Sequence, residues 1–249
     1  MVLSILDQAK EAESRTLERV PSFIVIGGGA VGARMAGQLL RAQAAGRLRT
    51  GAIVVVDRDP SCAASSLGSP VTLATADWEE WLAGHLGAWN PEGHLVPYHW
   101  APHVLEGWLA GEVRRAGGSV ERGGPLAPRD LPFERATGSG DRALSYASWP
   151  CPPMCIEPRL CPHTRGVRDW SLAADLARPD SRDPADESVV FRTMHFVYGV
   201  GTIPVRDIQA ARDRVVGAAR GGVGRTFVIA TSSHCHALAA TMRVIPVTA

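Results

Sequence analysis

The sequence predicts an α/β protein built on a doubly wound, mostly parallel sheet, with an insertion rich in cysteine and proline. Three observations predict this fold. Short apolar runs typical of buried strands alternate with amphipathic helical patterns over residues 1–120. The same alternation returns over residues 188–249, whereas residues 121–187 are rich in loops and show little periodicity. We therefore expect an N-terminal half-sheet, an inserted segment, and a C-terminal β-α-β half that completes the sheet.

The N-terminal half starts with leucines and acids spaced as in an amphipathic helix, over residues 1–20. A wholly apolar run at residues 23–26 predicts a buried strand. A glycine-rich turn then leads into a helix over residues 30–40, which returns to a second apolar strand at residues 53–56. This order predicts a β-α-β unit.

The alternation of strands and helices continues through the rest of this half. After a loop at residues 60–68, we expect strands at 71–74 and 94–98 and helices at 77–86 and 102–116. Asp77 is the expected N-cap of the first of these helices, and Pro102 suits the start of the second.

The glycine turn has the spacing G-x-G-x-x-G of a Rossmann-type dinucleotide site. Gly27 allows a tight turn, Gly29 lets the backbone approach a pyrophosphate, and Gly32 lets the helix pack closely. The second strand ends in Asp57, whose carboxylate can bind a ribose and repels a 2′-phosphate. Asp57 therefore favours NAD over NADP, while Arg58 favours the opposite choice. The alternative is a buried strand, a flexible turn and a capping acid that bind no ligand.

The segments IVIGGGAVGARMAGQL (residues 24–39) and VVVDRDP (54–60) resemble the N-terminal NAD-binding domain of the TrkA family. The resemblance covers roughly residues 22–110. It implies a six-stranded Rossmann fold that binds NAD or NADH, in a cytosolic regulator of a potassium-transporting membrane partner. The resemblance implies that the nucleotide-binding residues are Gly27, Gly29, Gly32 and Asp57.

The C-terminal part contains a second β-α-β pattern. We expect a strand at residues 189–198, a turn at 199–201, a helix at 205–219 and a buried strand at 226–230. The turn lacks the third glycine of the fingerprint, so the sequence predicts a single dinucleotide site. The length of the unit suits the far half of a doubly wound sheet.

The last predicted strand is followed by the segment Ser232–His236, which contains His234, Cys235 and His236. Ligands of open α/β sheets bind outside the carboxyl ends of the strands, so we expect this segment on the same rim as the glycine turn. His234 or His236 is then the candidate proton donor for hydride transfer at a nicotinamide. The alternative is that both histidines are ordinary surface-loop residues.

A proline-rich segment holds three of the five cysteines. Cys151, Cys155, Cys161 and His163 lie within thirteen residues, and five prolines over residues 150–162 prevent a regular helix. Three thiolates and an imidazole suit tetrahedral zinc, which we favour over an iron–sulfur cluster. Unligated thiols and a redox-active thiol pair are the alternatives.

The overall composition narrows the class of protein. The chain has 249 residues, 45% of them hydrophobic, which is enough for a substantial core, and a formal net charge of +1, which argues against nucleic-acid binding. No apolar run is long enough to insert into a membrane, and acids among the first twenty residues argue against a signal peptide. We therefore expect a cytoplasmic protein whose cysteines are thiols or metal ligands.

These expectations describe an NAD(H)-binding, NAD-dependent oxidoreductase that acts on an unidentified small molecule, with a metal site in the insertion. The dinucleotide and that small molecule are the expected partners, and the presence of a homo-oligomer is left open. The first alternative is a non-catalytic nucleotide-sensing module of the TrkA type. The second is a structural metalloprotein with a vestigial nucleotide site.

Overall fold

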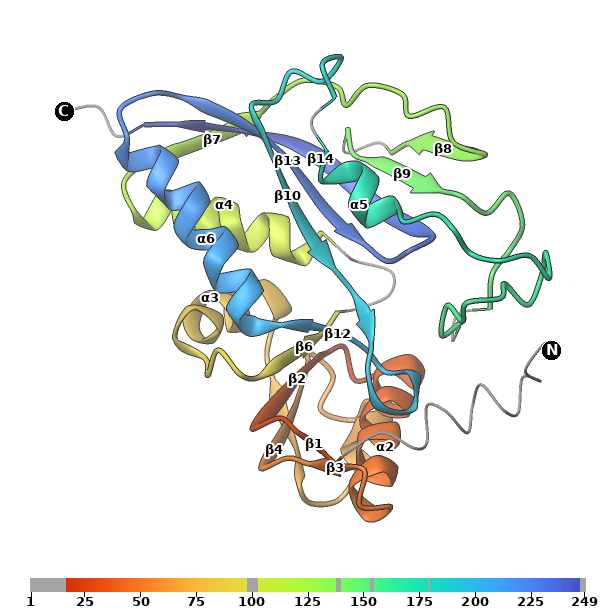
Figure 1. The fold of residues 1–249 in the computed structure, drawn as a ribbon. Coiled ribbons are helices and arrows are strands. Elements are labelled where there is room, and N and C mark those ends of the chain that lie inside the picture. Colours follow the sequence, from red (N-terminus) through yellow and green to blue (C-terminus); the bar gives the residue numbers. More distant parts are fainter. Residues whose placement is uncertain (1–16, 98–102, 138–139, 153–154, 179, 247–249) are drawn as a thin grey trace.

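The computed structural model describes residues 17–97, 103–137, 140–152, 155–178 and 180–246. It shows a mixed α/β protein in which a mostly parallel N-terminal sheet is followed by a mostly antiparallel C-terminal sheet (Figure 1). Most of the helix expected over residues 1–20 lies outside the described residues. No helix in the described ranges is both long enough and apolar enough to cross a lipid bilayer.

The N-terminal sheet of the described residues has six strands, and four neighbouring strands at one side of it are parallel. A two-stranded parallel pair, β1 (Glu18–Arg19) with β3 (Leu48–Arg49), lies beside it. The order across the six-stranded sheet is β11 (Met194–His195), β12 (Gly201–Pro204), β6 (His94–Val96), β2 (Ser22–Ile26), β4 (Ala52–Asp57) and β5 (Val71–Thr75). Strands β12 and β11 are antiparallel to their neighbours.

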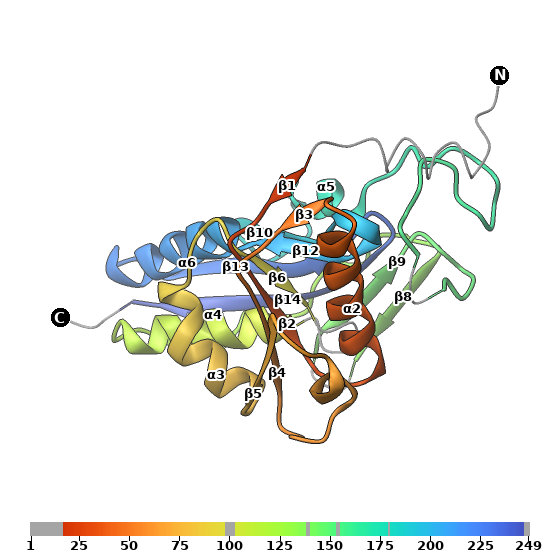
Figure 2. The ribbon, with the colours of Figure 1, turned by 90° about the horizontal axis from the view of Figure 1, so that it is seen from below.

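Helices cover both faces of this sheet, which explains why β2 is apolar throughout. Phe23 and Val25 pack in one core cluster with Leu39 of α2 (Ala30–Ala44). Ile24 and Ile26 point to the opposite face, where α3 (Trp78–His85) lies. Figure 2 shows the two helices on opposite sides of β2 and β4. Asp77 caps α3 as predicted, because its carboxylate accepts hydrogen bonds from the first-turn amides.

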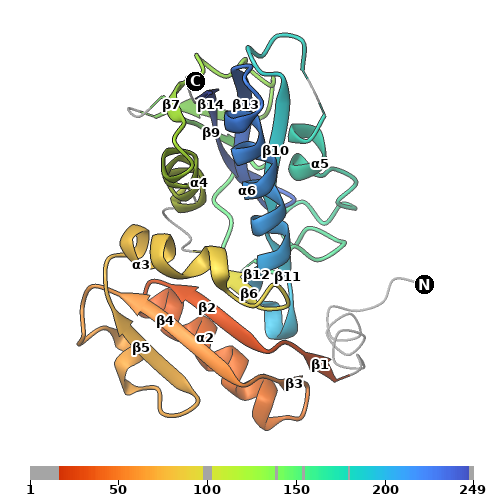
Figure 3. The same cartoon turned by 90° about the vertical axis from the view of Figure 1, so that its left-hand side faces the viewer.

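The C-terminal sheet is built around a long hairpin. Its order is β10 (Glu187–Arg192), β13 (Arg225–Ser232), β14 (His236–Ile245), β9 (Arg142–Ser145) and β8 (Phe133–Ala136), and β7 (Ser119–Arg122) also pairs with β14. Strands β10 and β13 are parallel, and the other pairs are antiparallel. Figure 3 shows α4 (Val104–Arg115) and α6 (Val205–Arg220) beside this sheet, with the N-terminal sheet below.

The side chains of β13 alternate between two cores, as expected for a buried strand. Phe227 and Ile229 pack with α4 and α6, whereas Val228 and Ala230 face α5 (Leu172–Leu176). Short 3-10 helices complete the fold: η1 (Ala63–Ser66), η2 (Leu86–Ala88) and η3 (Val197–Gly199).

The prediction that the second β-α-β unit completes the first sheet is wrong. The unit itself exists, with α6 between parallel strands β10 and β13, but β13 pairs with β10 on one side and β14 on the other. Its hydrogen-bonding edges are therefore both used within the C-terminal sheet. Only β11 and β12 join the N-terminal sheet, and β12 begins within the turn predicted at residues 199–201.

One core cluster joins the two sheets. It contains Ile24 and Leu95 of the N-terminal sheet, Phe227 of the C-terminal sheet, and Leu105 and Val215 of the helices between them. The two sheets are therefore held by shared burial rather than by a linker, and we expect them to unfold together.

Replacing Leu105 by Ala tests this coupling. Leu105 has 0% exposed surface within the shared cluster, and deleting such a side chain costs roughly 2–5 kcal/mol. We expect urea unfolding, followed by far-ultraviolet circular dichroism, to remain a single transition with a lower midpoint. Val223→Ala is the matched control, because Val223 is 69% exposed and should change stability by less than about 0.5 kcal/mol. Two separate transitions in the wild type would contradict the shared core.

Candidate functional site

The glycine turn lies at the carboxyl end of β2, as predicted. Gly27 has φ +84°, a left-handed conformation that favours glycine, and its amide donates to the Val56 carbonyl (2.9 Å). A methyl group on Gly32 would collide with the Gly27 carbonyl oxygen. Gly32 therefore lets the first turn of α2 pack against the turn itself, and the same methyl group would also lie 3.6 Å from the Val25 side chain.

The second residue of the turn, Gly28, is a site residue that the sequence argument missed. A methyl group there would collide with the sulfur of Cys62, which lies in the loop after β4. The Gly28 amide donates to Asp57 (N to Oδ2, 2.5 Å), and its carbonyl accepts from the amide of Ala64 (2.9 Å). The other Asp57 oxygen accepts from the amide of Asp59 (2.9 Å). The turn, the acid and the following loop thus form one connected unit.

The N-terminus of α2 remains open. Gly29 is its N-cap, without a side-chain cap, and the first turn contains no acidic residue. Apart from Gly29 and its two neighbours in the chain, no atom of the described residues lies within 4 Å of a methyl group placed on Gly29. Unpaired amides and the positive end of the helix dipole therefore face open space, which is the setting that favours a bound phosphate.

Arg58 forms an ion pair with Asp77. Its Nε donates to Asp77 Oδ2 (2.7 Å), although its side chain remains 78% exposed. The backbone amide of Glu80 and the Arg58 guanidinium lower the pKa of Asp77. Arg58 therefore links the end of β4 to the N-cap of α3.

The segment Ser232–His236 does not lie where the sequence argument placed it. It forms the turn between β13 and β14 in the C-terminal sheet, so the prediction of a shared rim with the glycine turn is wrong. The ring of His234 contacts Arg192 (Nε2 to Nη2, 3.0 Å), and that of His236 contacts Ser145 (Nδ1 to Oγ, 3.0 Å). The prediction failed because β13 pairs with β14, and no local sequence pattern specifies that pairing.

A buried glutamate holds this turn. Glu157 accepts hydrogen bonds from Ser233 Oγ (2.7 Å) and from the amides of His234 (3.0 Å) and Cys235 (3.1 Å). His195 Nε2 lies 3.8 Å from Glu157 Oε2 and forms an ion pair with it when protonated, and the glutamate side chain is 5% exposed. Glu157 belongs to the proline-rich segment, so it joins two regions that the sequence separates.

The predicted metal residues occupy an irregular, hairpin-like segment. Cys151 and Cys155 are half-buried, Cys161 is buried, and His163 is exposed with its ring stacked on Trp149 at 4.5 Å. No regular helix occurs in the described part of residues 151–163, as the prolines predict. Among the residues that the structure describes, no three His, Cys, Asp or Glu side chains are already arranged to hold a metal ion.

Cys235 also lies beside this segment, and the sequence does not predict this proximity. Cys235 accepts from Arg168 Nε (3.2 Å) and Trp170 Nε1 (3.4 Å). Burial raises the pKa of Cys151, and the neighbouring thiols of Cys155, Cys235 and Cys161 raise it further. The Tyr146 amide also donates to the Cys235 carbonyl (3.0 Å), and Trp149 stacks on His163, so the chain around the four cysteines lies in one region.

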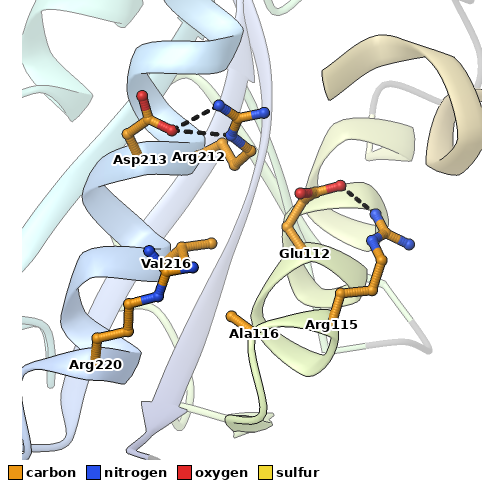
Figure 4. A pocket seen from close by; sticks show the side chains of 7 residues that line it. All are labelled: Glu112, Arg115, Ala116, Arg212, Asp213, Val216 and Arg220. Carbon is orange, nitrogen blue, oxygen red and sulfur yellow. Dashed lines mark hydrogen bonds and ion pairs between the residues drawn. The ribbon is translucent and has the colours of Figure 1, made fainter. Parts of the chain in front are cut away.

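The surface has two hollows of about 420 Å³ each, and the second adjoins the β13–β14 turn through Tyr146, whose amide donates to the Cys235 carbonyl (3.0 Å). The first separates α4 from α6, and Figure 4 shows its charged lining, in which Arg115 pairs with Glu112 and Arg212 with Asp213. The second is lined by Arg129, Tyr146 and Asp175, among others. Their charged residues are mostly paired with one another, so neither hollow changes the choice of site.

A known family model matches the C-terminal part of the chain. Residues 115–245 match the family model AF_1314_C, described as "Uncharacterized protein, C-terminal domain". The chain belongs to this family. The matched region includes the whole C-terminal sheet and α6, together with the cysteine segment. No curated protein and no solved structure matches the chain.

The predicted relationship to the TrkA family is wrong, because the matching family model is a different one and no TrkA model matches. The motif that suggested it encodes a turn, a helix start and an acid after a strand. Many nucleotide-binding chains need those features, so they specify local geometry rather than a family.

Two glycine variants test the geometry of the turn. Gly32→Ala should lower the free energy of unfolding by roughly 1–3 kcal/mol, because the new methyl group forces the Gly27 carbonyl to move. Gly29→Ala should change it by less than about 1 kcal/mol, because that position is open. Thermal unfolding measures both, and equal destabilisation would contradict this assignment of the two glycines.

Glu157 predicts an acid dependence of stability. Burial raises its pKa, but the hydrogen bonds from Ser233 and His234 and the charge of His195 together outweigh burial and lower it. A lowered folded-state pKa stabilises the protein above the ordinary glutamate pKa, and this contribution disappears as the pH falls through the lowered value.

Glu157→Gln should therefore remove about 1–3 kcal/mol near neutral pH and make the acid limb of the stability curve shallower. Glu92→Gln is the control, because the Glu92 side chain is 66% exposed and should leave the curve unchanged. Urea midpoints measured between neutral pH and about pH 3 test this prediction. Parallel curves of midpoint against pH for wild type and Glu157→Gln would contradict it.

Proposed function

We propose that the chain binds NAD(H) at the glycine turn. The observation that supports this proposal is the connected unit of Gly28, Asp57 and the open N-terminus of α2. The pyrophosphate would sit at the α2 amides, where Gly29 leaves room for it. Each Asp57 oxygen accepts one backbone amide and retains a lone pair for a ribose hydroxyl.

The charges around the site favour NAD(H) over its 2′-phosphorylated form. The Asp57 carboxylate would repel a 2′-phosphate at the ribose. Arg58 is the side chain that could offset this repulsion, but its guanidinium pairs with Asp77. Because the Arg58 side chain is largely exposed, this ion pair is weak and does little to hold Arg58 away from a 2′-phosphate. The preference for NAD(H) over NADP(H) therefore depends mainly on Asp57.

Nucleotide binding is better supported than hydride transfer. The proposed oxidoreductase needs a proton donor facing the nicotinamide, and the two candidates, His234 and His236, lie in the hairpin turn of the other sheet. A nucleotide-binding protein without turnover is therefore the second candidate function. Incubating the protein with NADH and a panel of small carbonyl compounds separates the two, since only an oxidoreductase consumes the reduced nicotinamide absorbance.

Calorimetric titration with NADH and NADPH tests the site. We expect wild-type protein to bind NADH more tightly by roughly tenfold or more, equivalent to about 1.4 kcal/mol. Asp57→Asn should narrow this gap, because the amide oxygen can still accept from Gly28 while the charge that repels the 2′-phosphate is gone.

Asp59→Asn is the matched control, because Asp59 is exposed and accepts from the amide of Ser61 (2.8 Å) within its own loop. It should leave both affinities unchanged. Equal binding of NADH and NADPH by the wild type would show that Asp57 does not select the nucleotide. Failure to bind either would overturn the proposed function.

A further inference from the structure

Four cysteines from two distant parts of the sequence lie in one region beside the β13–β14 turn. Three come from residues 151–161, and the fourth, Cys235, comes from the turn itself. Trp149 stacks on His163 at 4.5 Å, which brings the chain around Cys151 to that around Cys161, and the Cys235 carbonyl accepts from the Tyr146 amide (3.0 Å). A group of four free thiols in one place differs from the scattered cysteines of an ordinary core.

Cys161 lies at the start of a tight hairpin. Its amide donates to the Gly166 carbonyl (2.9 Å), its carbonyl accepts from the Arg165 amide (2.8 Å), and Leu160 pairs with Val167. The hairpin thus fixes the backbone from which the Cys161 side chain extends.

Cys235 is fixed in the same way from the other side. Its amide is held by Glu157, and its sulfur accepts from Arg168 and Trp170. The side chain is buried, with 5% of the residue exposed. Burial raises the pKa of Cys235, and the donors on its sulfur act against that rise, in favour of the thiolate that binds metal.

Charge balance also favours a cation among these thiols. A divalent ion with four thiolates carries a net charge of −2, which is costly to bury unless neighbouring donors offset it. The Arg168 guanidinium contacts Cys235 directly and acts on Cys161 as well. The backbone amide of Arg168 donates to the Arg159 carbonyl (2.7 Å), which keeps the Arg168 side chain beside the hairpin.

We propose that Cys151, Cys155, Cys161 and Cys235 together bind one thiophilic metal ion, most favourably zinc, and that His163 is not a ligand. The four sulfurs match the tetrahedral Cys₄ set of structural zinc sites. His163 has the right chemistry, but its ring is exposed and stacked on Trp149 with an interplanar angle of 9°. This site is separate from the nucleotide site and goes beyond the proposed function.

Metal binding completes this site rather than filling a finished cage, since no three ligands in the described residues already have the geometry for an ion. Cys161 and Cys235 are fixed by the hydrogen bonds above, whereas Cys151 and Cys155 lie in chain without regular secondary structure. Ligation supplies the free energy that draws such loops in. The metal would then tie the cysteine segment to the β13–β14 turn.

Two variants distinguish Cys235 from His163 as the fourth ligand. Protein purified without chelator or affinity metal should contain about one zinc per chain by elemental analysis. Cys235→Ser should lower zinc affinity by more than about 100-fold, because loss of an outer-shell partner alone costs roughly 10- to 100-fold. His163→Ala should retain stoichiometric zinc with an affinity within about twofold of wild type.

Cobalt substitution of the wild type keeps the test valid if Cys235→Ser fails to fold. The sulfur-to-cobalt charge-transfer intensity should correspond to four thiolates, and a value for three would overturn the assignment of Cys235. Loss of metal in His163→Ala with retention in Cys235→Ser would also overturn it. Wild-type protein that neither contains nor binds zinc would overturn the whole site, and iron with acid-labile sulfide would overturn the choice of zinc.

NADH titration of the same variants separates this proposal from the nucleotide site. The glycine turn belongs to the other sheet, so Cys235→Ser should bind NADH as the wild type does. Zinc binding without NADH binding, or the reverse, would therefore decide each proposal independently.

Discussion

Strand β13 is paired along both edges, and much of the molecule follows from that constraint. It bonds in parallel to β10 and antiparallel to β14, and eight of its residues are in register with β14. With both edges satisfied, β13 cannot extend the N-terminal sheet, so a second sheet forms around it. The turn that leaves β13 carries Cys235, and it meets the cysteine segment because the second sheet holds it there. Helices α4 and α6 then join the two sheets through one apolar core.

The glycine turn depends on contacts of a different kind, because its geometry is set within a few residues. Gly27 must be left-handed, and neither Gly28 nor Gly32 can carry a side chain without striking a neighbour. Asp57 connects the turn to the loop after β4 through two backbone amides. These steric limits and hydrogen bonds leave one open surface, the start of α2, and that surface suits an anion.

The turn after β13 is organised by buried charge. Glu157 is nearly inaccessible and is satisfied by a hydroxyl and two amides of that turn, while Arg168 and Trp170 donate to the sulfur of Cys235. Buried polar groups of this kind cost free energy unless each has a partner. Their arrangement gives a physical reason for the proline-rich segment to stay against the C-terminal sheet.

The sequence by itself determined the features that depend on short-range geometry. The glycine spacing, Asp57 after its strand, the Asp77 cap and the span of α6 were predictable because steric limits, capping and helical periodicity act within a few residues. The tertiary structure alone decided which sheet takes β13, and hence that His234 lies away from the glycine turn and Cys235 beside Cys161. Strand pairing joins segments far apart in the chain, and an apolar strand carries no local signal for its partner.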